Sequence, residues 1–399
     1  MTADPLRFLL LYSNTGGGHR GAAQAVQEAL EDRYGAQAAV EQIDALSEYA
    51  PWPFSGAPDA YGKTLLAGGY PYGLGFLLLD GRRRAQALSR FFWPYARQAA
   101  LRLLAEHPAD VVAAFHPIPV WSMCAALKES RSTTPLVAVG TDLAVMHAFY
   151  VAPDVRRYLV ATEIARAELL RHGVDPAMIE VTGLPIRRSF SQIAHQDPYA
   201  LREQLGLDPA RPLVVVMGGG VGFGPLEQVA RAVARARLPA QVVVLTGNNE
   251  RLRARLERWP LPAPARVQGF TPDVHLWMRA ADVLLTKAGP NSIAEALAVG
   301  VPMVLWGAIP VQETPNVRWV VDAGAALWAP GPRQATAATA RLLEDAAERE
   351  RMRQQARRLA RPEAAMRVAE ALWEMAGAGS SPRPRLPSAG CPAKPPGAG

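Results

Sequence analysis

Cysteine is scarce in this chain of 399 residues, which contains only Cys124 and Cys391. Two cysteines allow at most one disulfide and cannot supply the ligands of a typical cysteine zinc site. The sequence therefore excludes a disulfide framework and predicts a reducing cytoplasm. It also lacks an Asp-x-Asp pair and a His/Cys ligand cluster, so we expect neither a metal ion nor a cofactor.

Long hydrophobic runs are lacking as well. Long uncharged stretches such as residues 64–79 and 111–127 fall short of the roughly 20 residues that cross a bilayer, and Gly, Pro or His interrupts them. The first residues show neither a basic start nor a cleavage site, so we expect no signal peptide. Any contact with a membrane is therefore expected from one side only.

Positive charge is present in only mild excess. The net charge is +7, and three of these charges, Arg383, Arg385 and Lys394, lie in the Pro/Gly-rich residues 377–399. That segment has almost nothing to bury and is predicted to be a disordered tail. The remaining excess argues against a nucleic-acid partner but is compatible with an anionic membrane surface.

Short apolar runs alternate with stretches rich in Ala, Leu and Arg along the rest of the chain. This alternation predicts an α/β fold with parallel sheets. The strand candidates are residues 8–12, 111–115, 136–139, 158–161, 213–217, 242–245, 283–286 and 303–306.

Two of these strands run into glycine loops. The first is followed by "SNTGGGHRGAAQA" (residues 13–25), and the strand near residue 215 is followed by "GGGVGFGPLEQVARAVARA". Glycine lets the chain turn from strand to helix and lets a ligand approach the helix N-terminus, which favours phosphate. The repeat predicts two Rossmann-like domains facing each other across a cleft, at residues 1–192 and 193–376. A loop of this kind can also be only a tight turn.

A longer motif carries a family resemblance. Residues 284–327 read "LLTKAGPNSIAEALAVGVPMVLWGAIPVQETPNVRWVVDAGAAL". They resemble the C-terminal signature of glycosyltransferase family 28, and their wording is especially similar to its lipid galactosyltransferase branch. The glycine loop at residues 13–25 and the block "VGTDLAVMHAFY" resemble the start and the centre of the same family. The resemblance implies a GT-B fold that holds a UDP-sugar mainly in its second domain.

The resemblance also implies the donor-binding residues. Gly218, Gly219 and Gly220 would lie beside the diphosphate, and Asn248 and Phe270 would lie beside the nucleotide. Ser292 and Ile293, at the start of a helix, would offer N–H groups to the phosphates. Glu295 would hold the ribose hydroxyls, and Gln312 and Glu313 would contact the sugar.

Other readings of these residues stay open. Ser292 and Glu295 have the spacing of a capping box, in which the glutamate only reaches back to the helix start. Lys287 either approaches phosphate or lies on the surface. Val311 stands where the family has glycine, and a β-branched residue does not easily adopt positive φ. We therefore expect a differently shaped loop before Gln312.

The candidate catalytic residues are His19 and Asp142. Transfer requires a general base for the acceptor hydroxyl, and histidine titrates near neutral pH. A helix N-terminus beside His19 would lower the pKa of its imidazole. Asp142 follows a predicted strand, where the sites of parallel sheets gather. The alternatives are a loop histidine that bonds to backbone and an aspartate that caps a helix.

Residues 61–98 combine aromatic and apolar side chains with arginines, as a lipid enzyme requires. Aromatic rings anchor at lipid headgroups, and arginines attract anionic phospholipid. The alternative is a packed helix pair with solvated arginines. The residues predicted to contact acceptor or membrane are Gly17, Gly18, Phe76, Arg82, Arg83, Arg84, Phe92 and Trp93.

These features together predict an inverting glycosyltransferase. The resemblance implies transfer of galactose or glucose from UDP-galactose or UDP-glucose to diacylglycerol, which gives a β-glycolipid. The expected location is the cytoplasm, peripherally at the inner face of the plasma membrane. The alternatives are N-acetylglucosaminyl transfer to a peptidoglycan lipid precursor, a UDP-sugar epimerase, and a non-catalytic UDP-sugar-binding protein.

Overall fold

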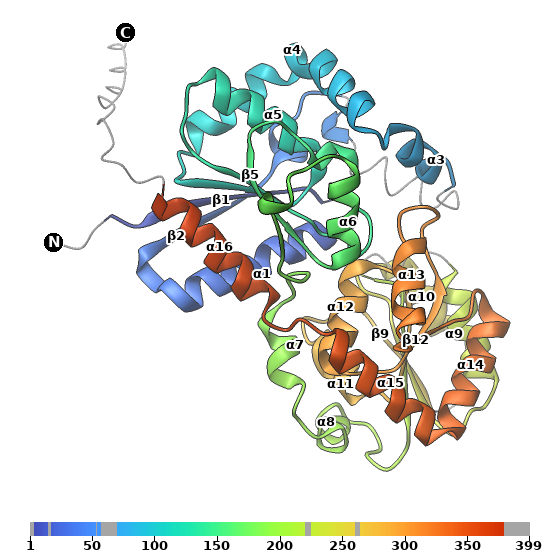
Figure 1. Cartoon of the computed structure of the whole chain (residues 1–399). Helices are drawn as coiled ribbons and strands as arrows, with labels where there is room; N and C mark the ends of the chain where they lie inside the picture. Colours follow the sequence, from blue (N-terminus) through green and yellow to red (C-terminus); the bar gives the residue numbers. More distant parts are fainter. Residues whose placement is uncertain are drawn as a thin grey trace, which may run out of the picture.

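The chain folds into two lobes, each built on a parallel sheet (Figure 1). The structure is a computed structural model, and it describes residues 4–14, 17–52, 54–56, 70–219, 225–259 and 264–378. The strands are β1 (Leu6–Tyr12), β2 (Ala38–Asp44), β3 (Val111–Ala114), β4 (Leu136–Val139), β5 (Val155–Val160), β6 (Ile179–Val181), β7 (Leu213–Met217), β8 (Gln241–Leu245), β9 (Ala265–Gln268), β10 (Val283–Lys287), β11 (Met303–Gly307) and β12 (Ala326–Trp328).

Helices connect the strands. They are α1 (Gly18–Tyr34), α3 (Tyr70–Leu79), α4 (Arg82–Glu106), α5 (Pro117–Glu129), α6 (Glu163–Arg171), α7 (Arg188–Ile193), α8 (Pro198–Gln204), α9 (Leu226–Arg235), α10 (Glu250–Arg258), α11 (Val274–Ala280), α12 (Pro290–Val299), α13 (Thr314–Asp322), α14 (Pro332–Glu344), α15 (Ala346–Leu359) and α16 (Ala364–Ala378), with the short helices η1 (Gly35–Gln37), η2 (Ala45–Tyr49), η3 (Phe54–Gly56), η4 (Ala148–Tyr150) and η5 (Pro176–Met178). In the described part of the chain, none is both long and apolar enough to cross a membrane.

The strand orders are β2-β1-β3-β4-β5-β6 and β12-β11-β10-β7-β8-β9, and every pairing is parallel. Central strands such as β3 (VVAA) and β7 (LVVVM) are buried along their whole length because helices cover both faces. This confirms the predicted two-domain α/β fold. In such sheets, ligands bind at the carboxyl ends of the strands, where the strand order reverses.

The last helix does not stay with the second lobe. Residues 193–376 were expected to form the second domain, but α16 crosses back and packs on α1 and β1 of the first lobe (Figure 1). Trp373 stacks on Tyr34 with ring centroids 3.8 Å apart, and Val368 and Leu372 are fully buried in the core beside β1. The helix also runs into the segment expected to be a disordered tail, because Gly377 and Ala378 still belong to it. Residues 379–399 lie outside the described part.

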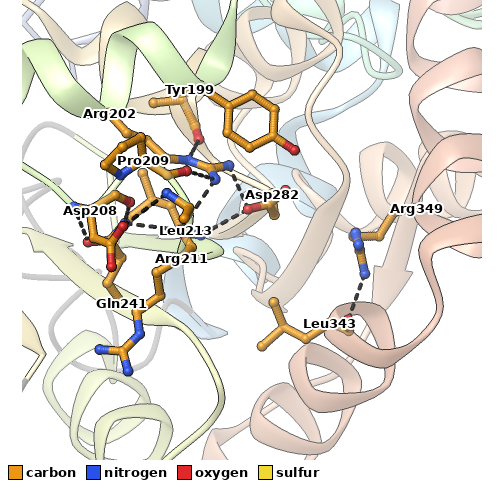
Figure 2. A network of polar contacts seen from close by, with 12 residues as sticks. Tyr199, Arg202, Asp208, Pro209, Arg211, Leu213, Gln241, Asp282, Leu343 and Arg349 are labelled. Atoms are coloured by element: carbon orange, nitrogen blue, oxygen red, sulfur yellow. Dashed lines mark hydrogen bonds and ion pairs between the residues drawn. The ribbon is translucent and has the colours of Figure 1, made fainter.

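A buried arginine connects the two central strands of the second sheet at their amino-terminal ends. Arg202 of α8 donates to Asp282, which precedes β10, over 2.6 Å, and to the Ala280 carbonyl over 2.9 Å (Figure 2). The same Asp282 carboxylate accepts the Leu213 amide at the start of β7. Because these bonds pair the buried guanidinium with the partly buried carboxylate, they fix the start of the two central strands.

Candidate active site

A cavity of about 410 Å³ lies where the carboxyl ends of the two sheets face each other. Loops from both lobes line it, so neither lobe forms it alone. The lining residues include Gly17, Gly18, His19, Thr141 and Asp142 from the first lobe, and Gly218, Gly219, Gly247, Phe270, Lys287, Asn291, Ser292, Glu295, Gln312 and Glu313 from the second.

His19 stands near the start of α1 with its imidazole held in one orientation. Its Nδ1 lies 2.8 Å from the carbonyl oxygen of Phe115 and 2.7 Å from the Thr141 hydroxyl. A carbonyl oxygen only accepts hydrogen bonds, so Nδ1 carries the proton and Nε2 keeps its lone pair. Burial lowers the pKa of His19 to about 4, so the ring is neutral at pH 7. The arrangement suits a proton acceptor.

Asp142 lies on the loop after β4 and contacts the opposite lobe. Gln312 Nε2 donates to its Oδ2 over 3.2 Å, while Oδ1 is buried with no hydrogen-bond partner among the described residues. Burial, with a smaller contribution from nearby Glu313, raises the pKa of Asp142 to about 7, although the Gln312 bond and the Lys287 ammonium act in the opposite direction. Asp142 therefore changes its charge close to neutral pH. The helix-cap alternative fails, since no helix begins at Asp142.

The loop that carries Gln312 turns through Val311, whose φ is 70°. The β-branched residue was expected to avoid this region and change the shape of the loop. The structure shows that it adopts the left-handed conformation itself, at a cost of order 1–3 kcal/mol. Helix α3 packs directly against this loop at Gly73. A Cβ atom at this position would lie only 2.7 Å from the Pro310 carbonyl oxygen. The packing leaves no room for a side chain at that position of α3.

Glu313 and Lys287 form an internal pair at the floor of the cavity. Glu313 Oε1 lies 2.5 Å from Lys287 Nζ, and its Oε2 accepts the Ile309 amide over 2.8 Å. Only 3% of the Glu313 side chain is exposed. The pair holds the lysine beside Gly219, whose φ is 74°. Lys287 is thus a lysine of the site rather than of the surface.

Helix α12 begins two residues before Ser292, with Pro290 as its first residue and Gly289 as its cap. Glu295 consequently lies in the second turn, and no hydrogen bond to its carboxylate forms within the residues described. The capping-box alternative is therefore wrong. Burial raises the pKa of Glu295 to about 7, with the Arg187 guanidinium acting in the opposite direction. Its carboxyl group faces the cavity unpaired, beside the N-terminus of a ten-residue helix.

The other donor candidates divide into two groups. Gly218, Gly219, Ser292 and the 62%-exposed Phe270 line the cavity. Asn248 does not: it is exposed, and Gly247 lines the cavity instead. The Ile293 amide, which was expected to face the phosphates, donates to the Gly289 carbonyl over 3.0 Å, and the Ile293 side chain is fully buried in the core of the second lobe. Gly220 lies outside the described residues.

The acceptor candidates also divide. Gly17 and Gly18 line the cavity, and Asn291 donates across the cleft to the Gly18 carbonyl over 3.3 Å. Phe76 packs on His147 at 4.5 Å between ring centroids. Arg82 and Arg84 donate to backbone carbonyls of His172, Gly173 and Asp80, whereas the exposed Arg83 makes no such bond in the described part. Phe92 and Trp93 line a second, separate cavity.

Sequence reasoning did not find Thr141 or Asn291. Thr141 orients His19, and its signal was its place immediately before Asp142 at the end of β4. Asn291 bonds between the lobes, which no pattern within one lobe can reveal.

Comparison with known proteins agrees with this geometry. A family model described as monogalactosyldiacylglycerol (MGDG) synthase matches residues 19–186, and the glycosyltransferase family 28 C-terminal domain matches residues 213–371. A rice (Oryza sativa subsp. japonica) protein named probable monogalactosyldiacylglycerol synthase 2, chloroplastic, is 35% identical over 388 residues, which cover 94% of this chain and 81% of the relative. The chain belongs to the monogalactosyldiacylglycerol synthase family. It is a UDP-sugar-dependent hexosyltransferase.

Solved structures confirm the GT-B fold of this family member. MurG of Acinetobacter baumannii superposes with a TM-score of 0.58 at 17% identity, covering 93% of this chain and all of that one. HepE of Anabaena, solved in complex with UDP, gives 0.53 at 15% identity, covering 92% and 100%. At these identities the likeness shows the fold alone.

The location expected from the sequence is wrong. The curated relatives carry the word chloroplastic in their names, which points to plastids for this family and not to the inner face of a plasma membrane. Low cysteine content indicates a reducing environment but does not distinguish one such compartment from another.

Proposed function

We propose that this family member transfers galactose from UDP-galactose to diacylglycerol with inversion, giving a β-linked galactolipid. One observation carries the proposal: His19 and Asp142 of the first lobe share a single cavity with Glu295, Gln312 and the Gly218–Gly219 turn of the second. The names of the relatives support galactose and diacylglycerol as the substrates.

The donor fits the second lobe. The N-terminus of α12, the Ser292 amide and the Lys287 ammonium surround the place where a diphosphate would lie, and all of these groups favour negative charge. Glu295 offers two oxygens to the vicinal ribose hydroxyls. Gln312 would reach the hexose, since its Oε1 is buried without a partner among the described residues.

The reaction then needs one displacement. His19 Nε2 accepts the proton of the lipid hydroxyl as the hydroxyl oxygen attacks the anomeric carbon. The bond from that carbon to the diphosphate oxygen breaks, and its electron pair leaves with UDP. Asp142, as a carboxylate, stabilises the positive charge that develops on the sugar ring. The helix terminus and Lys287 stabilise the leaving diphosphate, so no further cofactor enters the proposal.

A transfer assay tests the proposal. Radiolabelled UDP-galactose or UDP-glucose is incubated with diacylglycerol in phosphatidylcholine vesicles, with and without anionic phosphatidylglycerol, and the lipids are extracted. We expect label from UDP-galactose in a lipid whose anomeric configuration is β. We also expect more product on the anionic vesicles, because Arg83 and Arg90 are exposed near the apolar residues of α3 and α4. Label only from UDP-glucose, an α-linked product, or no lipid product would contradict the proposal.

The role of Glu295 can be tested separately. The Glu295→Gln substitution is expected to weaken UDP binding about tenfold, because a charged acceptor for the ribose hydroxyls is lost. Calorimetry with UDP and 2′-deoxy-UDP measures this effect, and the two proteins should bind the deoxy ligand with more similar affinities. The free energy of unfolding serves as the control and should not fall, since Glu295 caps no helix. Equal losses for both ligands would remove the ribose contact.

A further inference from the structure

A second cavity lies in the first lobe, away from the donor loops. Its volume is about 270 Å³, and no charged side chain lines it among the described residues. Protein interiors are normally packed with few voids larger than a water molecule, and an apolar space of this size has room for a hydrocarbon chain. The lining residues include Leu46, Pro51, Phe54, Leu79, Leu88, Phe92, Trp93, Ala96, Ala100, Leu103, Ile118, Trp121, Met123 and Phe149.

The cavity adjoins the catalytic residues through α5. His116, which caps that helix, packs edge-on against His19 with ring centroids 4.5 Å apart. Ile118 and Pro119, in the first turn of α5, line the cavity. Ile118 follows His116 by two residues, about 3 Å along the helix axis, so the His116 ring adjoins both His19 and the lining of the cavity. A molecule with a hydroxyl at His19 and a hydrocarbon chain in the cavity would therefore pass beside His116.

The mouth of the cavity is apolar as well. Leu79 and Ile118 line it and are 39% and 40% exposed. The exposed rings of Phe91 and Tyr95 lie beside the lining residues, since Phe92 contacts Phe91 and Phe54 contacts Tyr95. A contiguous apolar rim of this kind marks a surface that meets lipid or protein. The position of the cavity beside His116, which packs on the proposed base His19, favours lipid over protein.

We infer that this cavity holds one fatty-acyl chain of the acceptor lipid, with the lipid hydroxyl directed past His116 to His19. The inference rests on the proposed function and adds to it a subsite and a source of selectivity. An acceptor with a long chain fills the cavity and gains affinity from apolar burial, whereas a short chain leaves part of it empty.

Photolabelling tests the subsite without requiring turnover. A diacylglycerol with a diazirine at the end of one acyl chain is presented to the full chain in phosphatidylcholine vesicles, irradiated, and mapped by peptide mass spectrometry. We expect label in η2, α4 and the first turns of α5, displaced by excess unlabelled diacylglycerol. Label that spreads over the surface, or that resists competition, would overturn the inference.

A cavity-filling variant supplies the kinetic test. Ala96 lines the cavity from α4, so Ala96→Phe occupies it, and Gln98→Phe adds the same ring on an exposed position of the same helix. We expect Ala96→Phe to lower kcat/KM for a dioleoyl acceptor about tenfold. This loss corresponds to the burial free energy of about two methylene groups of the acyl chain, which the ring would displace from the cavity. The loss for a dioctanoyl acceptor should be smaller, and Gln98→Phe should change neither value.

The readouts separate the two proposals. UDP affinity confirms that the variants are folded, and Ala96→Leu replaces Ala96→Phe if the larger ring prevents folding. Normal transfer by the variant with an unchanged preference for chain length would overturn the acyl subsite and leave the proposed function intact. Competed label in the cavity with no hexose transfer by the wild-type chain would do the reverse.

Discussion

The His19→Ala substitution is expected to lower kcat about 10³-fold, because it removes the group that accepts the proton of the attacking hydroxyl. UDP affinity should stay within a factor of about two, since the donor-binding groups lie on the second lobe. Steady-state transfer and calorimetry with UDP measure the two effects. Nε2 is the nitrogen that would accept the proton, because Nδ1 already donates its own proton to the Phe115 carbonyl.

A control variant and a rescue experiment distinguish loss of the base from misfolding. His195→Ala removes an exposed histidine between α7 and α8 and should leave kcat unchanged. Added imidazole should restore part of the activity of His19→Ala but none to a variant that is merely misfolded. Near wild-type turnover of His19→Ala would remove the residue from the chemistry.

The Asp142→Asn substitution is expected to lower kcat about 10²-fold at pH 8 and to change the pH profile. Burial raises the pKa of Asp142 to about 7, so the carboxylate fraction falls as the pH falls below that value. For the wild type at saturating donor, kcat should therefore decrease about tenfold per pH unit below pH 7. The variant cannot ionise at this position, so its kcat should be flat between pH 5 and 7.

Removing the Gln312 side chain should shift the pH dependence of kcat in a known direction. Its amide donates to Asp142 and favours the charged carboxylate, so Gln312→Leu should move the acidic limb of the profile to higher pH. Saturating donor excludes a contribution from Glu295, whose pKa is also raised to about 7 and which affects UDP binding. If the fall of kcat below pH 7 persists in Asp142→Asn, the ionisation of another group causes it.

The inner strands of the fold could be predicted from the sequence, and the edges could not. All eight strand candidates overlap a strand of the structure, namely β1, β3, β4, β5, β7, β8, β10 or β11. The strands that were missed, β2, β6, β9 and β12, are the four edges of the two sheets. Edge strands are covered less completely, so β9 has no buried residue and its sequence, ARVQ, contains no continuous apolar run.

The position of a candidate residue could be predicted where it lies on a loop or in the first two turns of a helix that follows a strand. His19, Asp142, Gly218 and Glu295 follow strand ends, and the structure places all four in one cavity. Ile293 and Asn248 were named from motif position alone, and their side chains point into the core and to solvent. Motif position identifies a backbone that lies near a ligand, but the exposure of the side chain depends on packing that a single sequence does not contain.

The return of α16 means that the polypeptide passes between the lobes twice, once before α7 and once after α15. These two connections form a hinge with two attachment points. Such a hinge restricts the twisting of one lobe against the other but allows the lobes to open and close. Helix α16 packs into the core of the first lobe, so it moves with that lobe. A fluorophore attached beyond Ala378 and a second one on α14 would therefore report closure on the donor directly.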